Sequence, residues 1–513
     1  MKLYIFFLLG CLSSLNAQWN YENFDIDYTM YSVNDIYFNV SNLGEGSPGN
    51  LFGMNKEPGA TLLYSYDLNW ITNYREEVKH NGNRSESEFY VRNYIPGFID
   101  EYGQIVEPDD PKSKIFAISN DGHNLSYNEY LEQIRNYPTE AGAPWSDRNK
   151  NGVFDPELDS PVFYGDKMLW FARHNFFNLS TFTGIPIELK TKIFGFGNNP
   201  FLKNVIFIEY TLENKSDDPM LDFYPAFKFD PDLGRPYDDA FGCDSTLNLG
   251  FIYNKKSEDF EWGDYTPVMG IQLLDAPQNK NGESSKLSSM VYSEYSYRNS
   301  SLLEKIITIK QNLFRGLKDD GSPFINPQTG EPTKFLFHGN PYKGTGWNYT
   351  YVDSTFDEDI KLQMNCGPFD IYPRQSIKLL YALMLIDTDD INLSIQNIIN
   401  IAGMLKDSYR SLLEPQTIDT YEEEKTEYFY ISDNYPNPFN GTTNIKYIVK
   451  HESTIKVEVF NSLGQKIDTL LDEEKQPGIY FLSFNAAGLS SGTYFLRFDM
   501  GWFSEMIKMA YVK

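Results

Sequence analysis

Oxygen-bearing side chains occur at alternate positions in one short segment, Asp147 to Asp159, which reads DRNKNGVFDPELD. Calcium prefers oxygen ligands, and a loop that alternates Asp and Asn can turn several of them towards one point when a glycine permits the bend. Gly152 is placed for that bend. The pattern predicts a calcium loop whose ligands are Asp147, Asn149, Asn151, the carbonyl group of Val153, Asp155 and Asp159.

The segment departs from the EF-hand pattern near its end. An EF-hand has glutamate at the twelfth position of its loop. This chain has Leu158 there, followed by Asp159, and we expect no long helices on either side. The prediction is therefore a calcium loop outside the EF-hand fold, with Asp159 or Asp166 as a further ligand. The alternative is an Asn/Gly-rich turn that binds no metal.

A second acidic segment, Asp230 to Asp244, reads DPDLGRPYDDAFGCD. Its five aspartates are Asp230, Asp232, Asp238, Asp239 and Asp244. Carboxylates this close repel one another unless a cation or solvent offsets their charge. A second calcium site is one interpretation, and the acid/base pair of a glycoside hydrolase is another. The spacing alone does not separate metal ligands from catalytic groups.

Three other features bear on chemistry. Phe335 to Trp347, FLFHGNPYKGTGW, predicts either a loop that stacks a ligand or a tight turn around a buried Trp347. Cys243 and Cys366 would form one disulfide in an oxidising compartment or stay free. The sequence contains no HExxH, GxSxG, Walker or CxxC motif, which argues against a zincin, an α/β-hydrolase, a P-loop NTPase and a cysteine-zinc site.

The elements that must position these residues are mostly short strands. From about residue 30 to residue 390, β-prone runs alternate with clusters of Gly, Pro, Asn and Asp. Examples of these runs are Val205–Leu212, Phe223–Phe229 and Ile377–Ile386. A large β-rich body with few helices follows from this pattern.

Two segments favour helix instead. Between Ser394 and Leu413, apolar residues recur three and four positions apart, which predicts an amphipathic helix. Asn392 or Ser394 would cap this helix, and Pro415 would end it. A second, shorter helix is predicted over residues 126–136.

Composition supports a folded, β-rich protein. Aromatic residues make up 16% of the 513 residues, which suits sheet packing and argues against disorder. The net charge of −27 repels phosphate backbones, so we expect no nucleic-acid partner.

The N-terminus has the layout of a signal peptide. Lys2 precedes an apolar run from Leu3 to Gly10, and the small and polar residues from Ser13 to Ala17 predict cleavage after Ala17. The alternative is a lipoprotein signal in which Cys11 is lipidated. No later stretch reaches the roughly 18 apolar residues that a transmembrane helix needs, so we expect no transmembrane span.

The pattern of the sequence changes from Tyr428 onward. Asn434 to Asn440 reads NYPNPFN, an extended, turn-rich entry with two prolines. The turn at Asn461–Gly464 follows the second of six alternating runs. These runs, at 443–449, 454–460, 466–471, 478–484, 492–498 and 506–512, predict a small immunoglobulin-like antiparallel β-sandwich.

The motifs NYPNPFN, VEVFNSLGQKI, QPGIYFL and LSSGTYFLRF, with a last strand that ends in lysine, resemble the C-terminal sorting domain of type IX (Por) secretion cargo. The resemblance covers about Tyr428 to Lys513. It implies export to the periplasm, recognition by the type IX machinery at the outer membrane, and release or attachment at the cell surface. In that family the domain is usually removed.

The body also resembles a group of large exported proteins that carry the same sorting domain and have no assigned activity. The similar segments are GATLLYSYDLNWI, GAPWSDRNKNGVFDPELDSPVFYGDKMLWF, DPDLGRPYDDAFGCD, HGNPYKGTGW and CGPFDIYPRQSIKLLYALML. This resemblance implies one integrated β-rich body and no particular reaction.

These inferences predict a mainly β protein with a signal peptide at 1–17, a body at 18–413, an acidic linker at 414–427 and the sorting domain at 428–513. For the body we expect a calcium-stabilised scaffold that binds surface glycans or other surface components. The alternative is a secreted hydrolase, perhaps polysaccharide-active, that uses carboxylates near Asp230–Asp244.

Overall fold

The computed structural model describes residues 27–33, 36–42, 52–54, 63–80, 94–119, 132–156, 158–175, 178–179, 182–183, 185–199, 201–234, 238–255, 259, 262–263, 267–293, 303–348, 361–388, 390–413, 415–417, 429–432, 434–449, 452–476, 478–500 and 504–513. The predicted signal peptide and most of the predicted linker lie outside these residues. The described part is rich in antiparallel strands, which confirms the predicted fold class.

The larger sheet of the body has nine strands. In spatial order they are β18 (Asp239–Asp244), β19 (Leu249–Asn254), β20 (Val268–Asp275), β26 (Ser376–Ile386), β16 (Val205–Asn214), β15 (Ile187–Gly195), β12 (Lys167–His174) and β6 (Ile95–Pro96), with β9 (Phe116–Ser119) also paired to β12. Most residues of the central strands are buried on both faces. Both faces are therefore covered, which explains why these strands read as near-continuous apolar runs.

A second antiparallel sheet packs against the first. Its strands are β21 (Leu287–Ser293), β24 (Lys361–Cys366), β17 (Met220–Pro231), β4 (Leu63–Tyr74) and β5 (Glu77–His80), with β25 (Phe369–Ile371) also paired to β17. The ring centroid of Phe227 on β17 lies 4.9 Å from that of Tyr381 on β26 and 6.3 Å from that of Tyr210 on β16. These residues share one hydrophobic core, so the body has two packed β layers.

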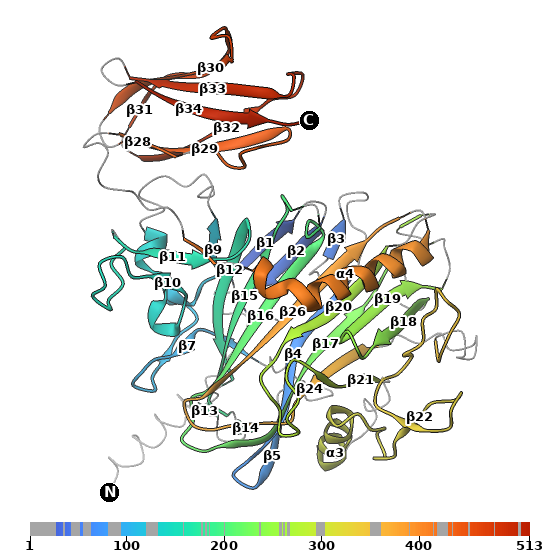
Figure 1. The fold of residues 1–513 in the computed structure, drawn as a ribbon. Helices are drawn as coiled ribbons and strands as arrows, with labels where there is room; N and C mark the ends of the chain where they lie inside the picture. The colour runs from blue at the N-terminus through green and yellow to red at the C-terminus, as the bar shows by residue number, and fades with distance from the viewer. Residues whose placement is uncertain are drawn as a thin grey trace, which may run out of the picture.

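Helix α4 (Ile391–Leu412) packs along the larger sheet at β19, β20 and β26 (Figure 1). Its predicted apolar stripe is buried. Gly270 of β20 permits the close approach, because a Cβ atom there would lie 2.8 Å from the side chain of Ile398. The predicted helix is confirmed.

The predicted cap of this helix is wrong. Asp390 caps it, because its side chain accepts a hydrogen bond from the backbone N–H of Asn392. Ser394 lies inside the helix, where it is buried and bonds to Thr388. The two predicted caps lie two and four residues after the observed one.

Helix α3 (Leu303–Phe314) was not predicted from the sequence. It packs against β4, β17 and β21. Its sequence, LEKIITIKQNLF, contains a run of Ile and Thr whose β-branched side chains favour strands. Of the second predicted helix, residues 132–135 are helical, and 126–131 lie outside the described residues.

The C-terminal region forms two further antiparallel sheets, with a hydrophobic core separate from that of the body. One sheet contains β28 (Phe429–Ile431), β29 (Thr442–Val449) and β32 (Gly478–Asn485), and the other β31 (Lys466–Lys475), β30 (Ser453–Asn461), β33 (Gly492–Asp499) and β34 (Ser504–Tyr511). The six predicted runs correspond to β29 to β34. Gly464 has φ 75°, as the predicted turn requires.

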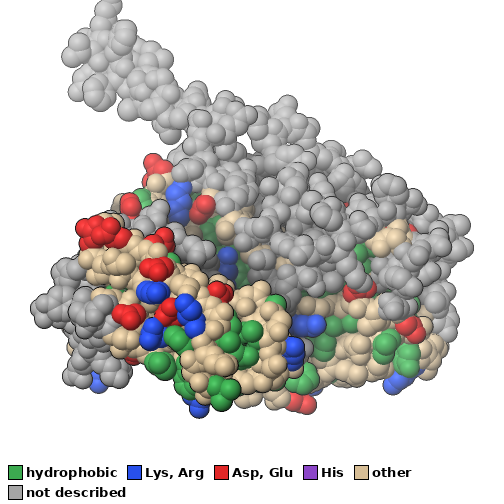
Figure 2. Space-filling model, turned by 90° about the horizontal axis from the view of Figure 1, so that it is seen from above, with side chains coloured by type: hydrophobic (Ala, Val, Ile, Leu, Met, Phe, Trp, Pro, Cys, Tyr) green, Lys and Arg blue, Asp and Glu red, His purple; other side chains and the backbone are tan. Residues whose placement is uncertain are grey.

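At the start of the segment predicted as a linker, β27 (Gln416–Thr417) pairs with β11 (Ser160–Phe163) of the body. The chain thus stays attached to the body for a few residues beyond α4. Of the helices that the structure describes, none combines the length and the hydrophobicity needed to cross a bilayer. On the face shown in Figure 2, acidic and basic side chains lie near one another on the described surface.

Candidate functional site

The predicted calcium loop connects two short paired strands. The strand β10 (Trp145–Ser146) pairs antiparallel with β11, with Trp145 opposite Pro161 and Ser146 opposite Ser160. This pairing holds the two ends of the 147–159 segment side by side. Strands rather than long helices flank the loop, as expected for a loop outside the EF-hand fold.

Hydrogen bonds turn the side-chain oxygens in the first half of the loop towards its backbone. The Asp147 carboxylate accepts hydrogen bonds from the backbone N–H of Gly152 (2.8 Å) and Asn151 (3.2 Å). The Oδ1 of Asn149 accepts one from Asn151 N–H, and the Oδ1 of Asn151 accepts one from Val153 N–H. Gly152 has φ 77°, so the glycine makes the predicted sharp bend.

The second half of the loop is held by Asp159. This side chain is fully buried, and its two oxygens accept hydrogen bonds from the backbone N–H groups of Arg148 and Asp155, both at 2.8 Å. Asp159 therefore ties the end of the loop to its beginning. Asp166, the other predicted ligand, accepts a hydrogen bond from Asn198 N–H instead.

The donor set of this loop fits calcium only if asparagine and backbone oxygens take part. Among the residues that the structure describes, no three side chains of His, Cys, Asp or Glu are grouped so as to hold a metal ion. The side chain of Val153 has no oxygen, so its carbonyl group is the part that a cation would use. Oxygen ligands of this mixed kind are those that calcium accepts.

The structure separates the five aspartates of the second acidic segment. Asp230 is buried on β17 and forms an ion pair with Lys361 of β24. Asp244, at the end of β18, accepts hydrogen bonds from the N–H and Oγ1 of Thr246 and from the N–H of Leu247. These two carboxylates have partners within the protein, and they do not need a cation to offset their charge.

Asp239 lies at a corner that links β17 to β18. Its Oδ2 accepts a hydrogen bond from Leu233 N–H (3.3 Å). Asn254, which is opposite Asp239 in the β18–β19 ladder, donates its Nδ2 to Leu233 O (3.1 Å). The Asp259 carboxylate lies against Gly234, because a Cβ atom there would be 2.0 Å from Asp259 Oδ1. The corner therefore brings Asp239, Asn254 and Asp259 around one short turn.

Sequence analysis missed Asn254 and Asp259. The hairpin formed by β18 and β19 would have pointed to Asn254, since it sets the register that places it opposite Asp239. Nothing in the local sequence pattern connects Asp259 to Gly234.

Burial raises the pKa of Asp239 well above its usual range. The Leu233 N–H opposes this rise, whereas the negative charges of Asp232, Asp238 and Asp259 add to it. A carboxylate that is both desolvated and surrounded by like charges is costly to keep ionised. The ionised form of Asp239 is therefore costly in the folded protein.

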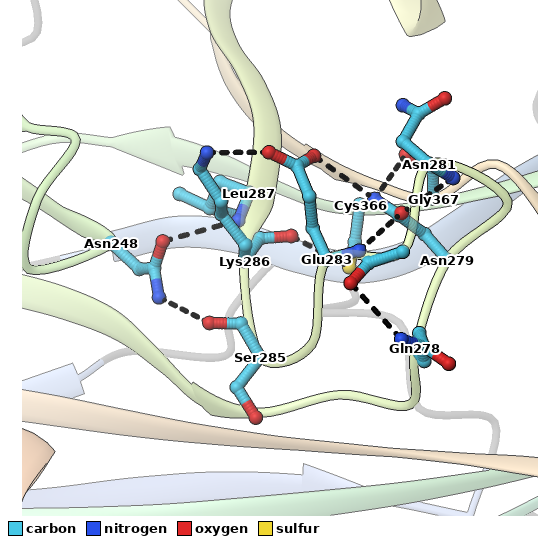
Figure 3. Close-up of polar contacts among 11 residues, drawn as sticks. Asn248, Gln278, Asn279, Asn281, Glu283, Ser285, Lys286, Leu287, Cys366 and Gly367 are labelled. Carbon is cyan, nitrogen blue, oxygen red and sulfur yellow. Dashed lines mark hydrogen bonds and ion pairs between the residues drawn. The ribbon is translucent and has the colours of Figure 1, made fainter.

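The remaining candidate residues serve as packing groups. The Trp347 ring is partly buried, with its centroid 5.0 Å from that of Phe337, which agrees with the packed-turn interpretation of that loop. Cys243 and Cys366 are both free and buried, so they form no disulfide. The Cys366 thiol donates to Lys286 O (Figure 3), and burial raises its pKa to about 12. A thiol of this kind stays protonated and unreactive at neutral pH.

In the C-terminal sandwich, the NYPNPFN segment closes the edge of the last strand. The amide of Asn437 donates to Lys508 O and accepts from Ala510 N–H, and the backbone of Phe439 pairs with Ala510 and Val512. The Phe439 ring packs on Tyr511 in the core. The motif thus covers backbone groups of β34 that an open edge would expose.

Residues 433–510 match the family of secretion system C-terminal sorting domains. No protein with a curated description matches the chain. One solved structure that matches is described as a polysaccharide lyase, with a TM-score of 0.20 and 8% sequence identity. The match covers 63% of this chain and 34% of that one, so this chain spans about a third of its length. A TM-score of this size does not establish a common fold.

The family match coincides with the separate C-terminal core and with the motifs that suggested it. Residues 433–510 therefore belong to the secretion system C-terminal sorting domains, and the chain is a type IX secretion cargo that is exported to the cell surface or secreted.

Proposed function

We propose that the body of this exported protein is a calcium-stabilised scaffold with a structural or binding role at the cell surface. The observation that carries the proposal is the 147–159 loop, whose ends are held by strand pairing while its Asp and Asn oxygens turn towards the bend. A folded loop of this kind reduces the entropy that a cation must overcome when it orders its ligands.

The cation would be held by side-chain oxygens of Asp147, Asn149, Asn151, Asp155 and Asp159 and by the carbonyl group of Val153. Several of these oxygens already accept backbone N–H groups. Each carboxylate oxygen has a second lone pair, so it can accept a hydrogen bond and bind a cation together. Calcium tolerates the irregular geometry that results, whereas magnesium demands a near-ideal octahedron.

A scaffold role is supported by the extent of the core. One hydrophobic cluster joins both sheets of the body and includes α4. A rigid frame of this size can present loops, such as 147–159, at fixed positions. Surface glycans or other surface components are the partners that we propose for these loops.

The test is a calcium titration of the purified full chain, followed by calorimetry and by thermal unfolding in calcium, magnesium and EDTA. We expect calcium to raise the melting temperature, because a ligand that binds only the folded state at 100 times its Kd adds about 2.7 kcal/mol. The Asp147→Ala variant should lose much of this gain. Asp217→Ala should keep it, since that aspartate is exposed and pairs with Arg374 at the surface.

Two results would contradict the proposal. One is a melting temperature that does not respond to calcium. The other is robust turnover of a polysaccharide in an assay for new reducing ends, abolished by Asp238→Asn in a protein that remains folded. The second result would establish a hydrolase that uses the 230–244 segment.

A further inference from the structure

The four-stranded sheet of the sorting domain ends in two edge strands that differ in how they are covered. One edge strand is β34, whose backbone groups bond to the NYPNPFN segment. The other is β31, which pairs with β30 and with no further strand among the described residues. With ten residues, β31 is also the longest strand that the structure describes in this domain. Unpaired N–H and C=O groups along such an edge can take up another strand.

The charges of β31 indicate what kind of strand would fit. Its middle carries four exposed carboxylates, those of Asp468, Asp472, Glu473 and Glu474. Its two lysines, Lys466 and Lys475, lie at the ends of the strand. Within the described part of the chain, Asp468 and Glu474 take part in no ion pair, whereas Asp472 and Glu473 have lysines nearby. The middle of the edge therefore carries negative charge that a basic strand would offset.

A second copy of the same edge does not fit. Antiparallel pairing of β31 with itself over its full length puts Asp468 opposite Glu473 and Lys466 opposite Lys475. Like charges directly opposite each other destabilise a pair of strands. The charge pattern thus keeps identical chains apart, and it leaves the edge available to a strand of opposite charge.

Apolar side chains at the start of the edge are not what a purely protective pattern would place there. Leu463, in the turn that leads into β31, is 80% exposed, and Ile467 on β31 is 39% exposed. The turn is fixed by Asn461, whose Oδ1 accepts the N–H groups of Leu463 (3.0 Å) and Gln465 (2.9 Å). A leucine that is exposed on a fixed turn loses little backbone entropy when it packs against a partner.

The far half of β31 is regular enough to pair with a further strand. Register shifts interrupt its ladder with β30 near the turn, between Val457 and Glu458 and between Val459 and Phe460. Beyond these shifts, residues 471–475 pair one to one with residues 453–457. Side chains alternate along a strand, so the three successive carboxylates at 472–474 point to both faces of the sheet. A strand that pairs here would meet an acidic side chain on either face.

We propose that β31 is the edge by which the sorting domain docks on the secretion machinery, and that its occupant is an extended strand with basic side chains. The strand pairs its backbone with β31, places lysine or arginine beside the carboxylates at 472–474, and contacts Leu463 and Ile467 with apolar residues at one end. In such strand addition the backbone supplies affinity and the side chains supply specificity. The inference rests on the family match of residues 433–510 and is independent of calcium binding by the body.

The first test measures export of the full chain by cells that have a type IX system. Glu474→Lys reverses one charge of the edge, and Leu463→Ser removes the exposed apolar side chain. Glu505→Lys is the matched control, because Glu505 is an exposed residue of β34, the opposite edge strand of the same sheet. All three side chains are exposed, so each variant should melt at the wild-type temperature. We expect Glu474→Lys and Leu463→Ser to lose export and Glu505→Lys to keep it.

The second test uses a synthetic peptide of alternating valine and lysine, as long as β31, and a matched peptide of alternating valine and glutamate. Each is added to the purified full chain, and amide hydrogen exchange is followed by mass spectrometry. We expect the lysine peptide to slow exchange in residues 466–475 and the glutamate peptide to leave it unchanged. The lysine peptide should bind Glu474→Lys about tenfold more weakly than wild type, because like charges then face each other.

Three results would overturn the inference. One is export of Glu474→Lys and Leu463→Ser at the wild-type level. Another is an equal loss of export in Glu474→Lys and Glu505→Lys, since the effect would then not belong to β31. The third is a lysine peptide that leaves exchange in residues 466–475 unchanged, or that slows it equally in wild type and in Glu474→Lys.

Discussion

The body and the C-terminal sorting domain are both built from antiparallel sheets, yet they place ionisable groups differently. The body buries Asp159, Arg173, His174, Glu188 and Asp230. Among the Asp, Glu, Lys, Arg and His side chains that the structure describes in the sorting domain, Glu458 is the one that is buried. It lies on β30 among Lys456, Lys466 and Arg497, whose side chains are 37–53% exposed.

The difference matters because a charge costs far more inside a protein than at its surface. Several buried ions of the body are met by specific partners. The Arg173 guanidinium lies 4.2 Å from the ring centroid of Tyr94 and 3.4 Å from Asp67, and Glu188 accepts Ile99 N–H and faces Lys190. The core of the sorting domain is formed by alternating apolar side chains. The core of the body also contains buried ion pairs and hydrogen-bonded charges.

The largest expected effect comes from breaking such a pair in the body. Lys361→Met removes the cation beside buried Asp230, and we expect a loss of roughly 3 to 5 kcal/mol in the free energy of unfolding, because the carboxylate stays buried without its counter-charge. Denaturant unfolding of the full chain measures it. The double variant Asp230→Asn/Lys361→Met should recover part of the loss. Equal stability of wild type and Lys361→Met would show that the body does not depend on this buried ion pair.

His174 should make the body sensitive to acid. Burial lowers the pKa of His174 to about 4, below the value near 6.5 of an unfolded histidine. Below about pH 6.5 the unfolded chain takes up a proton that the folded chain refuses, so stability falls as the pH drops towards 4. The shift corresponds to about 3 kcal/mol.

The measurement is the free energy of unfolding of wild type and His174→Gln between pH 7.5 and pH 4, given as the difference at each pH in order to remove the contribution of other groups. The difference should be constant above the unfolded pKa and should move in favour of the variant below it. A difference that stays flat across the whole range would mean that folding does not shift the pKa of His174.

A smaller effect is expected in the calcium loop. Asp159→Ala leaves the N–H groups of Arg148 and Asp155 without this acceptor in a partly buried position, which should cost about 1 to 2 kcal/mol. Thermal unfolding in EDTA measures this cost without a contribution from calcium. Asp159→Asn should cost less, since its remaining oxygen can still accept one of the two N–H groups. If Asp159→Ala is as stable as wild type, the loop does not need this anchor.

The same contrast decides how much the sequence could predict. In the sorting domain, one face of each sheet is wet, so apolar residues alternate along β29 and β30 and the strands could be read directly. The apolar stripe of α4 could be predicted from the sequence just as directly. In the body, both faces of β16 and β26 are covered, alternation is lost, and the Ile-rich helix α3 looked like another strand.

The candidate sites were predictable only as far as local spacing reached. The 147–159 segment carries its ligands within one loop, and its bend at Gly152 could be predicted. The corner depends on the pairing of β18 with β19 and on the approach of Asp259 to Gly234, which local patterns do not encode. His174 and Glu188, opposite each other in the β12–β15 ladder, were missed because a lone polar residue in a strand normally faces solvent.

The smallest effect is expected in the sorting domain. Lys466 lies 3.2 Å from buried Glu458, but its side chain is 53% exposed, and Lys456 and Arg497 remain to balance the carboxylate. Lys466→Gln should therefore cost less than about 1 kcal/mol, the range of exposed ion pairs. Scanning calorimetry of the full chain measures this cost. The comparison predicts that high salt changes the stability of this variant and of wild type by similar amounts. A loss as large as that of Lys361→Met would show that charge is as critical in the sorting domain as in the body.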